Sequence, residues 1–415
     1  MIEGKIIKFY REKAGLTQGQ LVKGICSVTH LSKIERGITE YSEEITQLLA
    51  KKLNINPQVE ITRYHNLSKK LERWHDAMIM QNLQKSEALK NELEQDELIQ
   101  LQEFNVYYQL LNVRYYLSKH QLAQAHGIIQ YLQKAETTLS SHDGNMLKHV
   151  RGIYYFLSGQ FQECVDVLIS IDQQQYNRLE YFYHLAIAYH SINSPVRAYY
   201  YADKALRYFR KTLNMLRIID TEMVMLIQLN SNEPHDFNET IDTYEKLLQM
   251  CDTCNAVERK SKLYHNLAFE YSRRKQYQEA ADLYQEALKL IDEHSPHYLT
   301  TLDRYIFSCY AGNLLSKELL IEKAQKGMKI AQAAKSKEWI YFQLHLYLLN
   351  QEEENYYQFI EHTALLFFKK MGYIILIDHY EKKLFHYLYE KGEVEKALEL
   401  ANSLIQTKHN PYDHD

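Results

Sequence analysis

The apolar residues of this chain recur at helical spacing along nearly its whole length, and the first 54 residues divide into several short helices. Ile6, Ile7, Phe9 and Tyr10 place apolar groups on one helical face, and Gly15 is well suited to end that helix. The chain therefore begins with a short amphipathic helix and a sharp turn.

A second short helix follows the turn. Thr17 and Gln20 form a capping-box pattern, in which each side chain hydrogen-bonds to the backbone of the other residue, so this helix begins after Thr17 and stops near Gly24. A later helix is expected to pack against the others through Ile45, Leu48, Leu49 and Leu53.

Between them, Ser27 is suited to cap a third helix over residues 27–36, which ends at Gly37. Leu31 and Ile34 would lie on its buried face, and small polar and basic side chains on its outer face. Two short helices joined by a tight turn, the second of them presenting such a face, predict a helix-turn-helix.

The segment GLTQGQL followed by LSKIERG resembles the lambda-repressor-like family of DNA-binding domains, over residues 3–57. The resemblance implies that helix 27–36 enters the major groove of double-stranded DNA and that Gln18 contacts a phosphate. The implied base-reading residues are Ser27, Val28, Thr29, His30 and Lys33. The turn KGICS is one residue shorter than the commonest family pattern. The assignment of base-reading residues along helix 27–36 can therefore shift by one position. A helical cap without a DNA role is the plainer alternative.

From about residue 62 onward the sequence repeats a helical hairpin pattern. The clearest copy, 261–294, follows the 34-residue tetratricopeptide pattern, with Ala268 and Ala280 small enough for two helices to approach closely. Weaker copies lie at 106–139, 145–178, 179–212 and 378–411. We expect an all-α fold of eight or nine hairpins that stack into a right-handed superhelix with a concave face. The expected domains are a DNA-binding head at 1–57, a linker with first helices at 58–105, and a peptide-binding repeat domain at 106–415.

The concave face of such a stack usually binds an extended peptide or a partner helix. Asn266 occupies the slot in which peptide-binding tetratricopeptide proteins carry an Asn, whose amide can both donate to and accept from a peptide backbone. The alternative is a solvated polar residue on an inner face. The remaining candidates offer cationic or aromatic groups, including Arg side chains that bind a carboxylate with two hydrogen bonds: Arg114, His184, Phe269, Arg273 and Arg304.

Composition supports a helical protein and narrows its chemistry. Gly and Pro supply only 18 of 415 residues, too few for a hairpin-rich β protein or for long disordered linkers. No stretch is apolar for the ~18 residues that a membrane helix needs, and five Cys do not make a disulfide framework, so a cytoplasmic location is expected. Cys251 and Cys254 form an isolated pair without two further zinc ligands, so we expect no metal and no cofactor.

Charge is unevenly distributed. The formal charge of the chain is −4, yet residues 1–55 carry nine Lys and Arg against six Asp and Glu. A basic head on an acidic body favours a head that binds nucleic acid. A net charge of +3 gives only weak affinity for DNA, so a homodimer or a higher oligomer is expected.

The head and the repeats together resemble the peptide-pheromone receptors of Gram-positive bacteria, the Rap, NprR, PlcR, PrgX and Rgg group. The TQGQL, GICS and LSKIERG segments are similar to the PlcR type, whereas the length is similar to NprR. Residues 67–120 are similar to the N-terminal helices of Rap proteins and NprR, a region that Rap proteins use to engage a sporulation response regulator. The resemblance implies a transcription regulator that is switched by a short signalling peptide in quorum sensing.

Two other functions stay open. One is a phosphorelay inhibitor that binds a response regulator and promotes its dephosphorylation through a Gln that orients water, for which Gln81, Gln84 and Gln102 are candidates. The other is a chaperone-like scaffold. The common enzyme motifs are missing from the sequence, so no catalytic residue is assigned.

Overall fold

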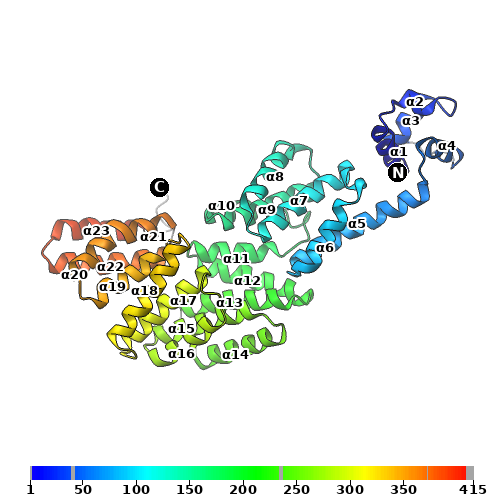
Figure 1. Ribbon diagram of the computed structural model, residues 1–415. Helices are drawn as coiled ribbons and strands as arrows, with labels where there is room; N and C mark the ends of the chain where they lie inside the picture. Colours follow the sequence, from blue (N-terminus) through cyan, green and yellow to red (C-terminus); the bar gives the residue numbers. More distant parts are fainter. Residues whose placement is uncertain (1, 39–42, 233–236, 372, 408–415) are drawn as a thin grey trace. The chain divides into compact units, whose positions relative to one another are not determined.

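A computed structural model describes residues 2–38, 43–232, 237–371 and 373–407. The described residues are largely helical and contain no strand (Figure 1). They form two compact units, residues 1–181 and 182–415, each considered by itself. The expected all-α fold, with a helix-turn-helix head followed by helical repeats, is confirmed.

The head consists of four helices whose ends follow the sequence signals. The helices are α1 (Ile2–Lys13), α2 (Gln18–Val22), α3 (Val28–Glu35) and α4 (Glu43–Leu53). Gly15 has a φ of 66°, and the backbone N–H of Leu16 bonds to the carbonyl of Arg11, so the left-handed residue ends α1 as predicted. The capping box between Thr17 and Gln20 is present. The head core gathers Ile7, Leu21, Val22, Leu31, Ile34 and Leu49.

Leu48, which was predicted to lie in the head core, is exposed instead. Leu49 is fully buried, and Ile45 and Leu53 are partly buried against the core, but Leu48 is 44% exposed. At 100° per residue, Leu48 lies ~140° or more from Ala50 and Leu53, which leaves it on the outer side of the helix. The prediction that Leu48 packs in the core is therefore wrong.

The region after the head is helical from its first residue. Asn56 caps α5 (Pro57–Ile79) by accepting from the N–H groups of Gln58 and Val59. Pro57 occupies the first turn, where a backbone N–H would have no acceptor within the helix, so its missing N–H costs no hydrogen bond. The 23-residue α5 contacts the head, since the Tyr10 hydroxyl donates to Glu60 at 2.8 Å. Helices α6 (Leu83–Glu94) and η1 (Glu97–Gln100) follow.

The rest of the first unit stacks further hairpins. Its helices are α7 (Gln102–Ser118), α8 (Leu122–Lys134), η2 (Glu136–Thr138), α9 (Ser141–Leu157) and α10 (Phe161–Ile169). Each helix of a pair packs on its neighbour in sequence, and α7 also packs on α5 and α9. The first helices of successive hairpins therefore form one layer.

The second unit continues the same arrangement after Tyr181. Its first four helices are α11 (Tyr181–Ser191), α12 (Pro195–Lys211), α13 (Met215–Asn232) and α14 (Phe237–Thr253). Next come α15 (Val257–Arg273), α16 (Tyr277–Lys289), α17 (Pro296–Ala311) and α18 (Lys317–Ala333). The last are α19 (Trp339–Leu349), α20 (Glu353–Phe359), the π-helical turn η3 (Ile360–Ala364), α21 (Leu365–Met371), α22 (Ile374–Glu390) and α23 (Val394–Thr407). Counted over the described ranges, the two units contain nine helical hairpins, in agreement with the expected eight or nine.

The hairpin α15–α16 shows how a repeat is held together. Ala268 and Ala280 are completely buried and pack with Tyr284, so the small side chains admit close approach and the ring fills the space beside them. Helices α13, α15, α17 and α19 pack side by side as the first-helix layer of the second unit. None of the described helices is long and apolar enough to cross a lipid bilayer.

Candidate DNA-binding helix and peptide-binding residues

Helix α3 presents most of the predicted base-reading residues to solvent. Ser27 caps α3, its hydroxyl accepting from the backbone N–H of His30 at 3.2 Å. Ser27, Val28, Thr29 and Lys33 are exposed, while Leu31 and Ile34 are completely buried on the opposite face. A short helix with a polar exposed face near its N-terminus matches what the major groove admits.

His30 is less accessible than the sequence suggested. Its side chain is only partly exposed, and its Nε2 atom is buried without a hydrogen-bond partner among the described residues. His30 is therefore less exposed than its expected place on the outer face implied, because at 100° per residue it lies ~40° from buried Ile34. The exposed part of α3 is centred on Thr29 and Lys33 instead.

Gln18 is held in place from inside the head. Its amide Nε2 donates to Glu35 Oε2 at 2.8 Å, and Glu35 is in turn paired with Arg11. The hydrogen bonds that Arg11 donates to Glu35 are the largest cause of an Arg11 pKa above its ordinary value, so the guanidinium stays charged. Gln18, at the start of α2, is thus anchored at one end and partly exposed at the other.

Arg114 lies in a buried ion pair in the first unit. Its guanidinium is 2.5 Å and 2.7 Å from the two carboxylate oxygens of Glu180. Nearby His75 is fully buried, and burial, together with the charge of Arg114, lowers the pKa of His75 well below its ordinary value. A ligand carboxylate could therefore reach Arg114 only by displacing Glu180.

The second unit brings three of the predicted peptide-binding residues together on its first-helix layer. Asn266 and Phe269 are three residues apart on α15, and the Arg304 guanidinium of α17 lies 5.9 Å from the centre of the Phe269 ring. Phe269 is 37% exposed, and Asn266 is partly exposed with no side-chain hydrogen bond in the described ranges. The Asn266 amide, the Phe269 ring and the Arg304 guanidinium thus lie on neighbouring helices, where each can still contact a ligand.

Arg304 stays cationic in this setting. Burial lowers the pKa of its guanidinium, but Asp303 and three tyrosine hydroxyls raise it, and the net pKa lies above the ordinary value. Asp303 itself is 2.7 Å from His345 Nε2. Arg304 Nε is 3.6 Å from Asp303 Oδ2, and a third of the Arg304 side chain is exposed. Arg304 can therefore still donate hydrogen bonds to a ligand carboxylate.

The two remaining predicted residues lie apart from this group. His184 is buried on α11 with its ring beside Tyr183. Arg273 is one turn beyond Phe269 and pairs with Glu270 at 3.3 Å. Among the described residues, no interaction joins His184 or Arg273 to Asn266.

A second charged cluster of the first-helix layer was missed from the sequence. Arg259 on α15 bonds to both carboxylate oxygens of Asp220 on α13, at 2.8 Å and 2.9 Å. Arg217 also approaches Asp220 at 3.3 Å and lies 4.6 Å from the Tyr183 ring centre. Arg217 and Asp220 have helical i, i+3 spacing, but no local signal connects them to Arg259.

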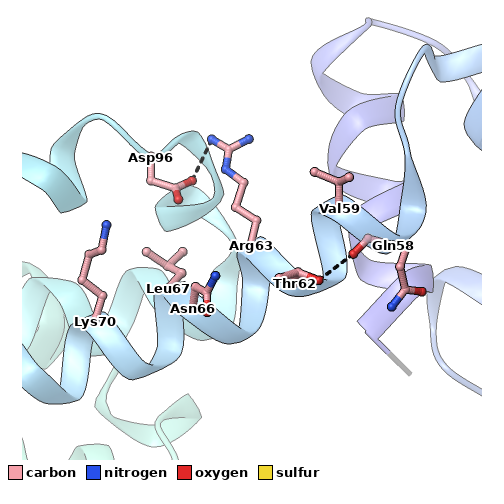
Figure 2. Close-up of a pocket in the computed structure, with 8 residues that line it drawn as sticks. All are labelled: Gln58, Val59, Thr62, Arg63, Asn66, Leu67, Lys70 and Asp96. Carbon is pink, nitrogen blue, oxygen red and sulfur yellow. Dashed lines mark hydrogen bonds and ion pairs between the residues drawn. The ribbon is translucent and has the colours of Figure 1, made fainter.

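The first unit contains a pocket that the sequence did not suggest. Figure 2 shows it along α5, where Arg63 points to Asp96. Its volume is about 530 Å³, and Arg63 Nη2 lies 2.9 Å from Asp96 Oδ1. Lys70 is 3.0 Å from Glu92. The lining residues are Gln58, Val59, Thr62, Arg63, Asn66, Leu67, Lys70 and Asp96.

Three family models match separate parts of the chain. They are a helix-turn-helix over residues 7–59, the N-terminal region of response regulator aspartate phosphatase H over 61–118, and a tetratricopeptide repeat over 261–294. The matches follow the chain in the order of the head, the first helices of the body and the α15–α16 hairpin.

Relatives and solved structures match nearly the whole chain. The transcriptional activator NprA of Geobacillus stearothermophilus is 21% identical over 390 residues, which cover 89% of this chain and 94% of NprA. The structure of NprR with its cognate peptide NprX has a TM-score of 0.64 and 21% identity, covering 83% of this chain and 99% of that one. A Rap protein complexed with Competence and Sporulation Factor has a TM-score of 0.69 and 16% identity, covering 83% and 98%. The resemblance to the NprR and Rap group is confirmed, and these structures share its fold.

Proposed function

We propose that this chain is a cytoplasmic transcription regulator that binds double-stranded DNA through α3 and is switched by a short signalling peptide. One observation carries the proposal: an exposed α3 and a repeat body with the fold of peptide-bound NprR occur in the same chain. The relative NprA is a transcriptional activator, which supports the same function.

DNA recognition is assigned to the exposed face of α3. Thr29 and Lys33 are one turn apart and exposed, so both can reach base edges when the N-terminal half of α3 lies in the major groove. Val28 can contact a thymine methyl group, and Gln18 and Ser27 lie at helix N-termini, where phosphates bind. His30 contributes at most its exposed edge.

Peptide recognition is assigned to the first-helix layer of the second unit. The Asn266 amide can donate to and accept from an extended peptide backbone. Phe269 supplies an apolar contact, and Arg304 supplies two donors for a carboxylate of the peptide. Arg273 and His184 remain candidates on the second unit, and Arg114 is a candidate on the first unit that is paired with Glu180.

The function is tested with the full chain and unbiased DNA. Double-stranded DNA is selected from random sequence on the purified protein, and its affinity is measured with and without synthetic peptides encoded by any small reading frame found next to the gene. We expect one enriched sequence and a peptide-dependent change in its affinity. A failure to enrich any sequence under either condition would contradict the proposal.

A second candidate function is binding of a response regulator through α5, α6 and α7. The match of residues 61–118 to a response regulator aspartate phosphatase region favours it, and the α5 pocket lies largely in that segment. Gln84 and Gln102 are exposed and Gln81 is partly exposed, so all three can reach a bound partner. Loss of phosphate from a phosphorylated response regulator, measured with wild type and with each Gln→Ala variant, tests this activity.

A further inference from the structure

Helix α12 carries a concentration of positive charge on an acidic body. Its residues 195–211 contain five Lys and Arg against one Asp, a net charge of +4, whereas residues 56–415 as a whole have a net charge of −7. None of the five cations is buried, and they are Arg197, Lys204, Arg207, Arg210 and Lys211. This helix therefore presents a local positive field to the solvent.

Three of these cations follow one another at a fixed spacing and form what we name the α12 row. Arg197, Lys204 and Lys211 are seven residues apart, which is ~10.5 Å along a helix, and their directions drift by only ~20° from one to the next. Val196 and Tyr200 lie beside the row and are 80% and 53% exposed. The α12 row is thus a nearly straight line of charge with exposed apolar surface along one side.

The α12 row has no carboxylate partner among the residues that the structure describes. Its three cations form no ion pair there. Two acids near the row are already paired, since Asp203 lies 2.6 Å from Arg207 and Glu222 lies 2.6 Å from Arg210. These acids compensate other cations and leave the row without a counter-charge.

Aromatic rings hold two of the cations in place. The ammonium group of Lys204 lies 4.6 Å from the centre of the Tyr200 ring and 5.0 Å from that of Phe182. The guanidinium of Arg197 lies 5.5 Å from the centre of the Tyr189 ring. Because the rings are neutral, they position the cations without cancelling their charge. Side chains that are ordered in advance lose less freedom when a partner binds.

We propose that the α12 row docks an acidic amphipathic helix of a partner protein. A helix with an Asp or Glu at every seventh residue has the same rise as α12, so it can place one carboxylate beside each cation of the row. Apolar residues between its acids would cover Val196 and Tyr200. The row uses none of the residues assigned to DNA or to the signalling peptide, so it adds a third binding surface to the chain.

The apolar edge of the row favours a protein over a nucleic acid or a lipid surface. A sugar–phosphate backbone offers charge but no apolar group to cover Val196 and Tyr200. An anchor on a lipid surface needs a broad apolar face that enters the headgroup region, whereas this side of α12 is mainly charged. Exposed Tyr and Arg side chains are typical of the surfaces through which proteins bind each other.

The test traps the contact between the full-length chain and a synthetic probe. The probe is a helical peptide of Ala and Gln with three Glu seven residues apart and two Leu between them on the same face. A water-soluble carbodiimide joins a carboxylate to an adjacent lysine amine, and mass spectrometry locates each cross-link. Cross-links at Lys211 should exceed those at exposed Lys329 on α18 roughly fivefold, and Lys204 should also be linked.

Two controls test the spacing of the probe and the surface that it meets. A peptide of the same composition with its Glu residues spread around the helix should lose the preference for Lys211. Arg197→Glu should reduce cross-linking at Lys211 roughly threefold, whereas Lys329→Glu, an equal change of charge, should not. Circular dichroism checks that both variants keep their helices.

The proposal is overturned if the two peptides cross-link equally or if the two variants have the same effect. It is also overturned if Arg197→Glu leaves peptide cross-linking unchanged but weakens binding to random-sequence DNA or to phosphatidylglycerol vesicles, because the row would then serve a nucleic acid or a membrane.

Discussion

Arg11 and Glu35 form a buried two-pronged ion pair inside the head, with Arg11 Nε 2.6 Å from Glu35 Oε1 and Nη2 2.9 Å from Oε2. Arg11 also donates to the carbonyl of Leu16 at 2.9 Å, and Glu35 accepts from Gln18. The pair thereby ties α1 and the turn after it to the starting residue of α2 and the end of α3.

Removing one partner of this pair should unfold the head selectively. Glu35→Ala leaves a buried guanidinium without its carboxylate, which costs about 3–5 kcal/mol. Hydrogen–deuterium exchange should show faster exchange in residues 2–38 than in the second unit. Glu44→Ala, an exposed acid in the same head, is the control and should change exchange little. Unchanged protection in Glu35→Ala would mean that the pair contributes nothing to the head.

The exposed face of α3 predicts which substitutions weaken DNA binding. Thr29→Ala combined with Lys33→Ala should cost about 1–3 kcal/mol for each base edge that the variant no longer reaches, with helicity unchanged. If Lys33 instead contacts a phosphate, the salt dependence of binding falls by about one unit of slope. His30→Ala is a poor probe because part of its ring is buried. Full operator affinity in the double variant would show that the register of α3 is wrong.

The peptide site is probed at Asn266. Asn266→Ala should reduce peptide affinity roughly ten- to a hundredfold, because an unsatisfied buried amide costs about 1–3 kcal/mol. The repeat core should persist, since Ala268 and Tyr284 supply it. Calorimetry with the cognate peptide gives the affinity, and exposed Gln278→Ala on α16 is the matched control. Equal affinities for wild type and Asn266→Ala would make Asn266 a solvated surface residue.

Two partly buried histidines predict acid sensitivity of the second unit. Burial lowers the pKa of His265 to about 3 and that of His297 to about 4, and each positive neighbour adds to the effect. In the unfolded chain both titrate near 6.5, so between those values the unfolded state binds more protons. Stability is therefore complete above pH ~6.5 and falls as the pH drops toward 4.

Hydrogen exchange of α15 and α17 at pH 7 and pH 5 measures this loss, after correction for the intrinsic pH dependence of exchange. His265→Gln should reduce the pH dependence, whereas exposed His65→Gln should not. If the pH dependence in His265→Gln equals that of wild type, the loss comes from other groups.

A final prediction contrasts two residues that precede the second unit. Glu180→Ala should destabilise the first unit by about 3–5 kcal/mol, because it leaves buried Arg114 without its carboxylate partner. Arg178→Ala removes ion pairs to half-exposed Glu72 and Asp76 and should cost only about 1 kcal/mol. Urea unfolding is monitored by the fluorescence of Trp74, which is completely buried on α5, in a Trp339→Phe background, so that the signal follows the first unit. If Arg178→Ala destabilised the first unit more than Glu180→Ala, the Arg114–Glu180 pair would not be the stronger of the two contacts.

The sequence predicted the parts of the structure that depend on local rules. Gly15, the Thr17 capping box and the Ser27 cap act over a few residues, so their patterns located the head helices closely. The Ala268 and Ala280 positions likewise depend on a fixed repeat. Such features need no knowledge of distant segments.

Contacts between distant segments escaped the sequence analysis. Arg114 appeared available for a ligand because Glu180, 66 residues away, has no pattern that connects the two. Leu48 was assigned to the core because periodicity identifies an apolar residue without fixing the exact edge of the buried face. For the same reason the sequence did not show that His30, which is next to buried Leu31, is only partly exposed.

The continuous α5 connects the head with the last residues of the first unit. Its 23 residues span ~34 Å, with Glu60 joined to Tyr10 near one end and Asp76 joined to Arg178 near the other. A tilt of ~5° about the Arg178 end would carry the Pro57 end ~3 Å, close to the ~3.4 Å rise of one base pair. A tilt of only a few degrees would thus displace the head by about the length of one base-pair step.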